Sequence, residues 1–348
     1  MVSIRDVAKK SGFSVSTVSN VINGRVDQMS KSTLERIETC IKELGYRPNR
    51  SAQQLKSGHV KMIGVLVPSI MNPNFAILVN ELEEIARQKY GYQIILGNTN
   101  RQDQQEELLL EDMSSFGIRG AIVVSANTKK DHFIKALDNG MHLISYDGLS
   151  FSDEASLLMD SVSLDNFKAG FMATSFLLDQ KLDDLVFVSI KGDIVSRHNK
   201  IEGFKAALAQ RGINQENRLL MCEATSDYGD AELSDLGKKA AARLLKERKA
   251  LPQGIVVLND MLALGMISYF QTQGIKVPQD ISIVGIDNIF MSSLMSPALT
   301  TIASPINKIA DLLLKRLIAR VEGQHLKPKE FLYSPKLICR DSVKVLKR

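Results

Sequence analysis

Between residues 60 and 342 the sequence alternates short apolar runs with longer amphipathic stretches, and this alternation constrains the fold more than any other feature. Strands that are apolar on both faces and are joined through helices form parallel sheets covered on both sides. About 280 residues is generous for one such sheet, so we expect an α/β body with two lobes. The predicted strands are residues 62–67, 93–97, 120–124, 142–146, 185–190, 254–258 and 281–286. The helical stretches include residues 75–89, 165–179, 199–211, 230–248 and 305–321.

The first 47 residues carry signals for three short helices. Ser3 and Asp6 have the spacing of a capping box. The helices are expected to begin after Ser3, after Ser14 and after Ser30 or Ser32, and to end at Gly12, Gly24 and Gly45. Two short helices joined by a tight turn, with a third closing the core, indicate a helix-turn-helix unit.

In this geometry the second helix reads DNA with its N-terminal turn. That turn is Val15-Ser16-Thr17, and Ser19 and Asn20 follow on the next turn. Alternatively, these polar side chains are only solvent-exposed positions on a small helical bundle and contact no DNA. Val15 argues against it, because an apolar residue on an exposed turn suits a thymine methyl group better than water.

The charge distribution supports a DNA-binding head. The chain has 44 Lys and Arg against 39 Asp and Glu, a net charge of +5. Residues 1–60 hold ten of the basic and five of the acidic side chains, so they account for the whole excess. A cationic head on a balanced body indicates a module for a polyanion joined to a module for something else.

Residues 48–60 are expected to form a hinge. Five or six helix-competent residues after Ser51 are too few to be stable alone, so this segment needs a partner to fold. An inert linker is the alternative. The single large apolar side chain, Leu55, lies between cationic neighbours, which suits a wedge inserted into the minor groove.

Several classes of protein are excluded by what the sequence lacks. Three cysteines far apart fit a reducing cytoplasm and neither a disulfide framework nor a zinc finger. No nucleophile, metal-ligand or phosphate-loop motif is present, so we expect no enzyme, no metal and no cofactor. The N-terminus has no apolar signal region, and the uncharged stretches 62–80 and 288–307 are broken by prolines, so no membrane association is expected.

Polar residues follow three of the predicted strands at their carboxyl ends, where ligands bind in parallel α/β folds. These are Asp147, the pair Asn259-Asp260, and Asp287. A single one of them is best explained as a turn or helix cap, and Asp260 in particular can cap the helix that follows it. Three such strand ends together predict a ligand pocket.

The ordered motifs closely resemble those of the lactose-repressor (LacI/GalR) family of bacterial regulators. They include Ile4-Arg5-Asp6-Val7-Ala8, residues 16–23 and 44–49, Asn72-Pro73, Gly203-Phe204, Val284 to Asn288 and Pro297 to Ile302. The resemblance spans residue 3 to about 342. It implies a homodimer on a near-palindromic double-stranded operator, with a small-molecule effector bound between the lobes of a periplasmic-binding-protein-like core. No leucine heptad follows Ser342, so a dimer is expected.

The resemblance also implies a division of the chain. We expect a DNA-binding domain at 1–47, a hinge helix or linker at 48–60 and a ligand-binding core at 61–342. Crossings near 161–164, 288–290 and 320–324 would assign about 61–162 and 290–321 to the N-terminal lobe, and 163–289 and 322–342 to the C-terminal lobe.

Family contacts transfer to matching positions with some departures. Where family members have an aromatic residue after Asn-Pro, this chain has Asn74, followed by Phe75. Where they have an Arg before the Gly-Phe pair, it has Lys200, with Arg197 one turn earlier. Where they have an Arg after the aspartate at 147, it has Gly148. Without Trp, the stacking platforms are Phe75, Phe290 and Tyr228. The predicted ligand contacts are Asn74, Phe75, Asp147, Arg197, Lys200, Asn259, Asp260 and Asp287. The predicted DNA contacts are Ser3, Val15, Ser16, Thr17, Ser19, Asn20, Asn23, Arg50, Ala52, Gln53, Leu55 and Lys56.

The sequence therefore predicts a cytoplasmic, effector-controlled transcription regulator, most simply a repressor. Acidic and amide groups around a cation fit a sugar or sugar derivative; a nucleoside, an amino sugar and a sugar phosphate are the alternatives. A solute-binding receptor would need an export signal. An enzyme with a regulatory head would need a nucleophile or a metal site.

Overall fold

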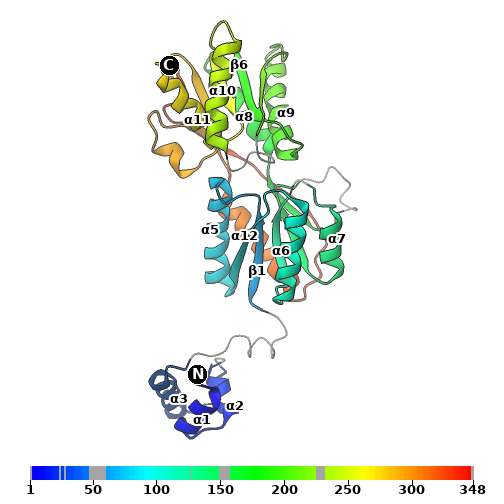
Figure 1. The fold of residues 1–348 in the computed structure, drawn as a ribbon, viewed down its shortest axis with the longest axis vertical. Coiled ribbons are helices and arrows are strands. Elements are labelled where there is room, and N and C mark those ends of the chain that lie inside the picture. Colours follow the sequence, from blue (N-terminus) through cyan, green and yellow to red (C-terminus); the bar gives the residue numbers. More distant parts are fainter. Residues whose placement is uncertain are drawn as a thin grey trace. The chain divides into compact units, whose positions relative to one another are not determined.

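The computed structural model describes residues 2–22, 25–26, 29–46, 60–125, 127–148, 157–224 and 232–345. The chain divides into two compact units, a head (Met1–Val60) and a body (Lys61–Arg348), which fold around separate cores (Figure 1). The predicted hinge and the boundary at residue 47 fall on residues 47–59, outside the described residues, so the predicted domain limits stay predictions.

The head contains three helices at the predicted places: α1 (Ile4–Ser11), α2 (Val15–Ile22) and α3 (Lys31–Leu44). The backbone N–H of Thr17 donates to the Ser14 hydroxyl over 3.1 Å, and that of Thr33 donates to the Ser30 hydroxyl over 3.2 Å. The two serines therefore cap α2 and α3, and Ser30 rather than Ser32 begins the third helix.

The predicted apolar faces of these helices meet in one small core. Val7, Val18 and Ile37 are fully buried, one from each helix, and they fix the orientation of α2 on the other two. Gly12 and Gly45 end α1 and α3 with φ of 79° and 58°, which favours glycine; Gly24 lies outside the described residues.

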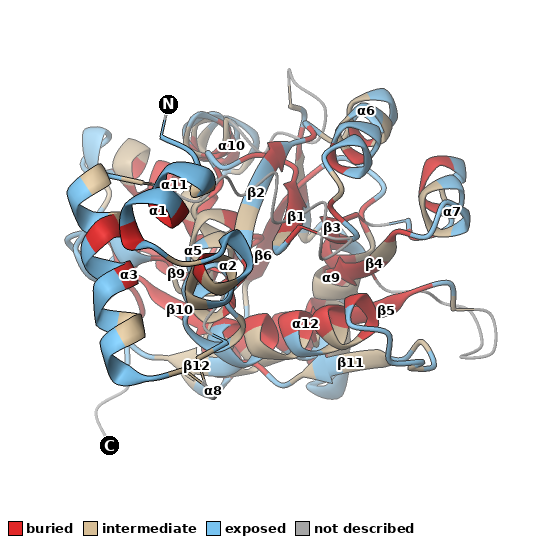
Figure 2. Ribbon diagram, turned by 90° about the horizontal axis from the view of Figure 1, so that it is seen from below, coloured by how far each residue is buried: buried red, intermediate tan, exposed pale blue. Residues whose placement is uncertain are grey.

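The body contains two six-stranded sheets, one in each lobe. The N-terminal sheet has the order β11-β5-β4-β3-β1-β2, and every neighbouring pair is parallel. Apolar side chains alternate between its faces: α5 and α12 cover one, and α6 and α7 cover the other (Figure 2). Its strands are β1 (Met62–Val67), β2 (Gln93–Asn98), β3 (Gly120–Val124), β4 (His142–Tyr146), β5 (Asp160–Leu164) and β11 (Glu330–Tyr333). Its helices are α5 (Pro73–Ile85), which continues into a π-helical turn η1 (Ala86–Tyr90), α6 (Asp103–Ser115), α7 (Asp131–Asp138) and α12 (Ile306–Val321).

The C-terminal sheet has the order β12-β10-β9-β8-β6-β7 and is parallel except for β12, which runs antiparallel to β10. Its strands are β6 (Leu185–Ile190), β7 (Leu219–Cys222), β8 (Gly254–Val257), β9 (Ser282–Asp287), β10 (Thr300–Ala303) and β12 (Lys336–Ile338). Its helices are α8 (Asn166–Asp179), α9 (Val195–Gln210), α10 (Leu233–Glu247) and α11 (Asp260–Thr272), with a 3₁₀ turn η4 (Phe290–Ser293).

The predicted crossings between the lobes need correction. Residues 160–164 form β5 of the N-terminal sheet, so the first crossing follows them. Strand β10 pairs with β9, and β11 pairs with β5, so the second and third crossings lie near 304–305 and 334–335 rather than 288–290 and 320–324. Residues 290–303 belong with the C-terminal sheet and 322–333 with the N-terminal one. These strands have only three to five residues and lack an apolar run, so the sequence pattern did not reveal them.

Close packing of α8 and α9 fixes the helix that carries Lys200. A Cβ at Gly170 would lie 2.0 Å from the backbone carbonyl of Lys200, and a Cβ at Gly203 would lie 2.0 Å from that of Phe167. Only glycine permits this approach, so Gly203 of the predicted Gly-Phe motif serves helix packing. The first turns of α9 are thereby held firmly against α8.

The two uncharged stretches tested as membrane spans belong to the body. Residues 62–80 form β1 and the start of α5, and residues 288–307 contain η4 and β10. Within the described ranges, no helix combines the length and the apolar content needed to cross a membrane.

Candidate functional site

The first turn of α2 presents an outward surface. Val15 is 43% exposed, Ser16 and Asn20 are exposed, and Thr17 and Ser19 are half-buried beside the buried Val18. The Ser14 hydroxyl lies 2.7 Å from that of Ser16 and 2.8 Å from that of Thr17. The cap thus holds two hydroxyls of the predicted reading turn in place before any ligand arrives.

Ser3 forms the predicted capping pair with Asp6. Its backbone N–H and its hydroxyl each donate to the Asp6 carboxylate over 2.8 Å, and these two hydrogen bonds lower the pKa of Asp6. Ser3 therefore has a structural role at the start of α1, where it is exposed. The other predicted DNA contacts, Asn23, Arg50, Ala52, Gln53, Leu55 and Lys56, lie outside the described residues.

In the body, the residues predicted at strand ends separate into two groups. Asp147 and Asp287 end β4 and β9 in different lobes, and both have positive φ, 60° and 120°. Their charges influence each other, because Asp147 raises the pKa of Asp287. The carboxyl ends of the two sheets therefore bring an acid from each lobe within electrostatic range of each other, at the edge where ligands bind in such folds.

Asp147 is tied to the first crossing between the lobes. Its carboxylate accepts a hydrogen bond from the Asn166 side chain over 3.0 Å and one from the Ser163 hydroxyl over 3.2 Å. Ser163 lies on β5 and Asn166 begins α8. A ligand that formed a hydrogen bond with the Asp147 carboxylate would therefore compete with the hydrogen bonds to Ser163 and Asn166, in the segment that joins the lobes.

Asp287 is the least satisfied acid of the cleft. In the part of the chain that the structure describes, no hydrogen bond reaches its carboxylate. Burial raises its pKa to about 7; the ammonium of Lys200 opposes this shift, and the charges of Asp260 and Asp147 add to it. A positive φ and a partly buried, poorly paired charge are costs that functional sites commonly retain.

Two cations from α9 were predicted beside this acid, and they differ in availability. The Lys200 ammonium donates to the Leu258 carbonyl over 3.3 Å. It is also close enough to Asp287 for its positive charge to lower the pKa of that carboxyl group. Arg197 is buried, and its guanidinium donates to the Lys191 carbonyl over 3.3 Å. Lys200 is the cation that can meet a ligand; Arg197 holds the loop after β6.

Asn74 and Tyr146 supply the polar surface of the N-terminal lobe. The Asn74 side chain forms a hydrogen bond with the buried Tyr146 hydroxyl, whose pKa is raised by burial. The Asn74 carbonyl oxygen is buried, and no partner for it exists among the described residues. A buried acceptor without a partner is costly, and this oxygen keeps the capacity to accept a hydrogen bond.

Two predicted contacts, Phe75 and Asn259, have structural roles. Phe75 packs in the core of its lobe and is only 5% exposed, so its ring offers little stacking surface. Asn259 caps α11 by accepting the Leu262 N–H over 2.9 Å. Of the other platforms, Phe290 is 73% exposed on η4, and Tyr228 lies outside the described residues.

Asp260 is the clearest correction. It is fully buried, and its carboxylate accepts hydrogen bonds from the hydroxyls of Ser292 and Thr301, both over 2.6 Å, and from the Ile289 N–H over 3.1 Å. These bonds join the segment after β9 and strand β10 to the start of α11. Its acceptor capacity serves the fold, and its influence on the cleft is electrostatic.

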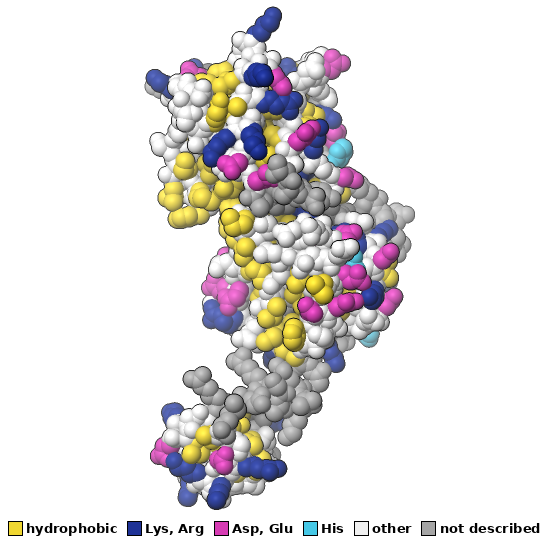
Figure 3. Space-filling view, in the orientation of Figure 1, with side chains coloured by type: hydrophobic (Ala, Val, Ile, Leu, Met, Phe, Trp, Pro, Cys, Tyr) yellow, Lys and Arg dark blue, Asp and Glu magenta, His cyan; other side chains and the backbone are white. Residues whose placement is uncertain are grey.

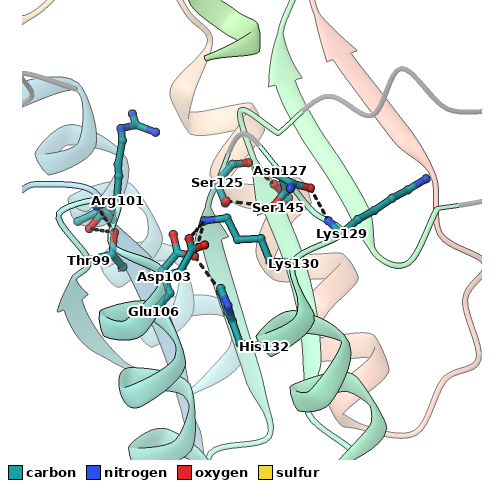
Figure 4. A network of polar contacts seen from close by, with 11 residues as sticks. Thr99, Arg101, Asp103, Glu106, Ser125, Asn127, Lys129, Lys130, His132 and Ser145 are labelled. Atoms are coloured by element: carbon teal, nitrogen blue, oxygen red, sulfur yellow. Dashed lines mark hydrogen bonds and ion pairs between the residues drawn. The ribbon is translucent and has the colours of Figure 1, made fainter. Parts of the chain in front are cut away.

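Polar residues that were not predicted as contacts follow two further strands, β2 and β3. Figure 4 shows Arg101 after β2, and Ser125 and Asn127 after β3, on the same edge of the sheet as Asp147. The strand-end rule that found Asp147 would have found them had it been applied to all predicted strands.

Beneath this edge, Figure 4 shows Lys130 and His132 converging on Glu106. The buried Glu106 carboxylate lies 2.7 Å from the Lys130 ammonium and 2.9 Å from the His132 ring nitrogen. The starts of α6 and α7 are thereby joined, which fixes the loops that carry the strand-end residues. Across the described ranges, no group of His, Cys, Asp and Glu side chains could hold a metal ion.

Comparison with known proteins follows the same division into head and body. Residues 3–49 match the family model for "Bacterial regulatory proteins, lacI family", and residues 174–343 match that for "Periplasmic binding protein-like domain". Catabolite control protein A of Priestia megaterium is 32% identical over 317 residues, which cover 91% of each protein.

Two solved structures of similar proteins contain bound ligands. A lac repressor dimer bound to operator and the anti-inducer ONPF has a TM-score of 0.81 at 23% identity, with 98% of each chain covered. A lacI-family transcriptional regulator from Enterococcus faecium with bound ribose has a TM-score of 0.70 at 29% identity, covering 82% of this chain and 100% of that one.

The raised pKa of Asp287 makes a prediction about stability. From the ordinary value of 3.8 up to about 7, the folded state keeps a proton that the unfolded state has released, so folding loses free energy as the pH rises through this range. We expect Asp287→Asn to be more stable than the parent at pH 8, with a difference that shrinks towards pH 4. Urea unfolding at a series of pH values measures it, with Asp112→Asn at an exposed site as control. A difference that does not change with pH would contradict the burial of an ionisable Asp287.

Proposed function

Because the chain belongs to the lacI family of bacterial regulatory proteins, we propose that it represses transcription by binding an operator as a homodimer under the control of a small effector. The body, similar to periplasmic binding proteins, would hold the effector between its lobes. Its curated relatives are regulators, so the chain is a regulator and not an enzyme. Since its target would be chromosomal DNA, we place it in the cytoplasm.

The reading turn of α2 carries the proposal for DNA. Val15, Ser16 and Asn20 are exposed on a helix whose inner face is anchored by Val18. An apolar group, a hydroxyl and an amide in this order match the thymine methyl and the donor and acceptor edges of a major groove. The remaining predicted DNA contacts, Ser3, Thr17, Ser19, Asn23, Arg50, Ala52, Gln53, Leu55 and Lys56, are part of the same proposal.

Replacing Asn20 tests the reading helix. We expect Asn20→Ala to weaken binding to the preferred operator by about 1–3 kcal/mol and to relax base preference, because an amide that reads a base edge contributes this much. The operator is first obtained by selection from random duplex DNA, and affinities are measured by fluorescence anisotropy at fixed salt. Thr39→Ala, at an exposed position of α3, is the control. Equal operator affinity for Asn20→Ala and Thr39→Ala would place base recognition elsewhere.

Exposed apolar side chains support the proposal of a dimer. Phe290, Met291, Leu294 and Met295 form one exposed set around η4, and Ile70 and Met71 form another after β1. Figure 3 shows apolar side chains gathered along this flank of the body. A water-soluble monomer rarely exposes so many large apolar groups together, whereas a dimer would cover them.

A charge introduced into this flank should separate the subunits. Leu294 is 66% exposed, so Leu294→Glu leaves the core intact and would place an unpaired carboxylate in the dimer interface. We expect sedimentation velocity to give a dimer for the parent and a monomer for this variant. Phe116→Glu, at a 70% exposed residue after α6, is the matched control and should stay dimeric. Dissociation by both variants, or by neither, would contradict the assignment.

The chemistry of the cleft supports a sugar or a sugar derivative as effector. The Asp147 and Asp287 carboxylates and the unpaired Asn74 oxygen are acceptors, whereas Lys200 is the cation facing them. Acceptors in this excess suit a ligand rich in hydroxyl or amine donors. A sugar phosphate fits less well, because Asp287 already compensates the Lys200 charge. Phe75, Arg197, Asn259 and Asp260 would act by supporting the cleft.

A thermal-shift screen against sugars, amino sugars, nucleosides and sugar phosphates tests this class. An effector at 100 times its dissociation constant stabilises the folded protein by about 2.7 kcal/mol, so it raises the unfolding temperature. We expect the largest shift from a sugar or amino sugar, and a smaller one for Asp287→Asn, which should keep its operator affinity. A shift confined to sugar phosphates, or one unchanged by Asp287→Asn, would contradict the proposed contacts.

A further inference from the structure

The N-terminal lobe has a second cavity, at the opposite end of the sheet from the cleft. It has a volume of about 480 Å³ and lies beside the start of β4, the end of α12 and the segment 324–328. His142 opens β4 at this cavity, whereas Tyr146 closes the same strand at the cleft. Four steps of about 3.3 Å along the strand separate them, so the cavity is no part of the effector site.

One side of the cavity is cationic. His142, Arg320, His325 and Lys327 line it. Burial lowers the pKa of His142, and the positive charges of Arg320, Arg119 and His325 lower it further. The groups that face this imidazole from α12, from the segment after α12 and from the turn before β3 are therefore all basic.

A buried carboxylate, that of Asp160, holds Arg316 and Arg320 of α12 in place without cancelling their combined positive charge. Asp160 on β5 is fully buried, and Arg316 donates to both of its oxygens over 2.8 Å, while Arg320 forms a further ion pair with it. One carboxylate thus faces two guanidinium groups, and a net positive charge remains. Burial alone would raise the pKa of Asp160, but the hydrogen bonds from Arg316 and Arg320 outweigh this and lower it.

The same arginines hold the segment that closes the cavity. Arg316 donates to the Lys327 carbonyl over 2.8 Å, Arg320 donates to the Leu326 carbonyl over 3.1 Å, and the Lys329 N–H donates to Asp160 over 2.7 Å. The wall is therefore fixed before a ligand arrives, which reduces the entropy lost on binding.

The other side of the cavity is apolar. Leu137 of α7, Leu143 of β4 and Met159 before β5 line it, together with Leu326 and Pro328. A small inorganic ion would leave this surface unused, and a neutral apolar molecule would leave the cations unpaired. The lining fits a molecule that has both an anionic group and an apolar body.

We propose that this cavity is a second ligand site, separate from the effector cleft, which binds an organic anion with an apolar body through His142, His325 and Lys327. Carboxylates, sulfonates and phosphate esters share this chemistry. The Arg316–Asp160–Arg320 cluster acts as the support that positions the wall of the site.

Naphthalene-2-sulfonate is a suitable probe, because its charge is constant over the pH range of interest. Isothermal titration of the full-length chain should give one site per chain and an affinity at least about tenfold higher than for sulfate or for 2-naphthol, which offer the charge or the ring alone. We expect the double variant His325→Ala/Lys327→Ala to lose about tenfold or more in affinity. Both residues are exposed, so the variant should fold normally.

A matched control variant distinguishes loss of the site from loss of positive charge in general. Lys315→Ala removes the same charge from an exposed position of α12 and should leave the affinity unchanged. The affinity should rise as the pH falls from 8 to 5.5, because a bound anion opposes the positive charges that lower the pKa of His142 and so favours its protonation. His142→Gln should reduce this dependence. Unchanged affinity in His325→Ala/Lys327→Ala, or equal affinity for 2-naphthol, would overturn the proposal. Loss of sulfonate binding in Lys200→Ala would assign the probe to the effector cleft and would overturn it as well.

Discussion

The parallel direction of the strands is the constraint on which the cleft depends. In the N-terminal sheet all strands end on the same edge, where Asp147 follows β4 and Arg101 follows β2. Asp287 ends β9 of the C-terminal sheet, close enough to Asp147 for its charge to raise the pKa of Asp287. The helices that cover the sheets supply the remaining groups, Asn74 from the first turn of α5 and Lys200 from α9. The apolar alternation that builds the cores therefore also determines where polar chemistry can collect.

Two aspartates of the C-terminal lobe show how the surroundings divide structural from binding roles. Asp260 receives three hydrogen bonds and holds the segment after β9 against strand β10, although burial raises its pKa. Asp287 lies nearby with a positive φ, and its carboxylate accepts no hydrogen bond from any described residue. The satisfied acid stabilises the frame, and the unsatisfied one retains the capacity to bind. This division explains how the fold tolerates a buried charge at its binding edge.

The sequence was sufficient for features that depend on local patterns. The apolar runs of β1, β3, β4 and β6 and the serine caps of α2 and α3 follow from residue spacing alone, and the structure agrees with them. The short strands β5, β10, β11 and β12 were not predictable in this way, because their pairing partners, rather than their own residues, make them strands. For the same reason the lobe crossings were placed up to about 15 residues from where the pairings put them.

The candidate site could be predicted only in part. The strand-end rule located Asp147 and Asp287, but it could not distinguish Asp287 from Asp260, because that difference depends on Ser292 and Thr301, 32 and 41 residues further along the chain. The burial of Phe75 likewise depends on α12 packing across the same face of the sheet. Family resemblance supplied the function, and the tertiary contacts decide which residues remain available for it.

In the proposed mechanism, binding of the effector changes the affinity of the dimer for its operator, and binding of the operator changes the affinity for the effector. The most direct measurement is a complete thermodynamic cycle: operator affinity with and without saturating effector, and effector affinity with and without saturating operator, on the full-length protein at fixed salt. We expect the two ratios to be equal and to correspond to a coupling of about 1–3 kcal/mol, because allosteric coupling is reciprocal. An effector that binds the free and the operator-bound protein with the same affinity would contradict it.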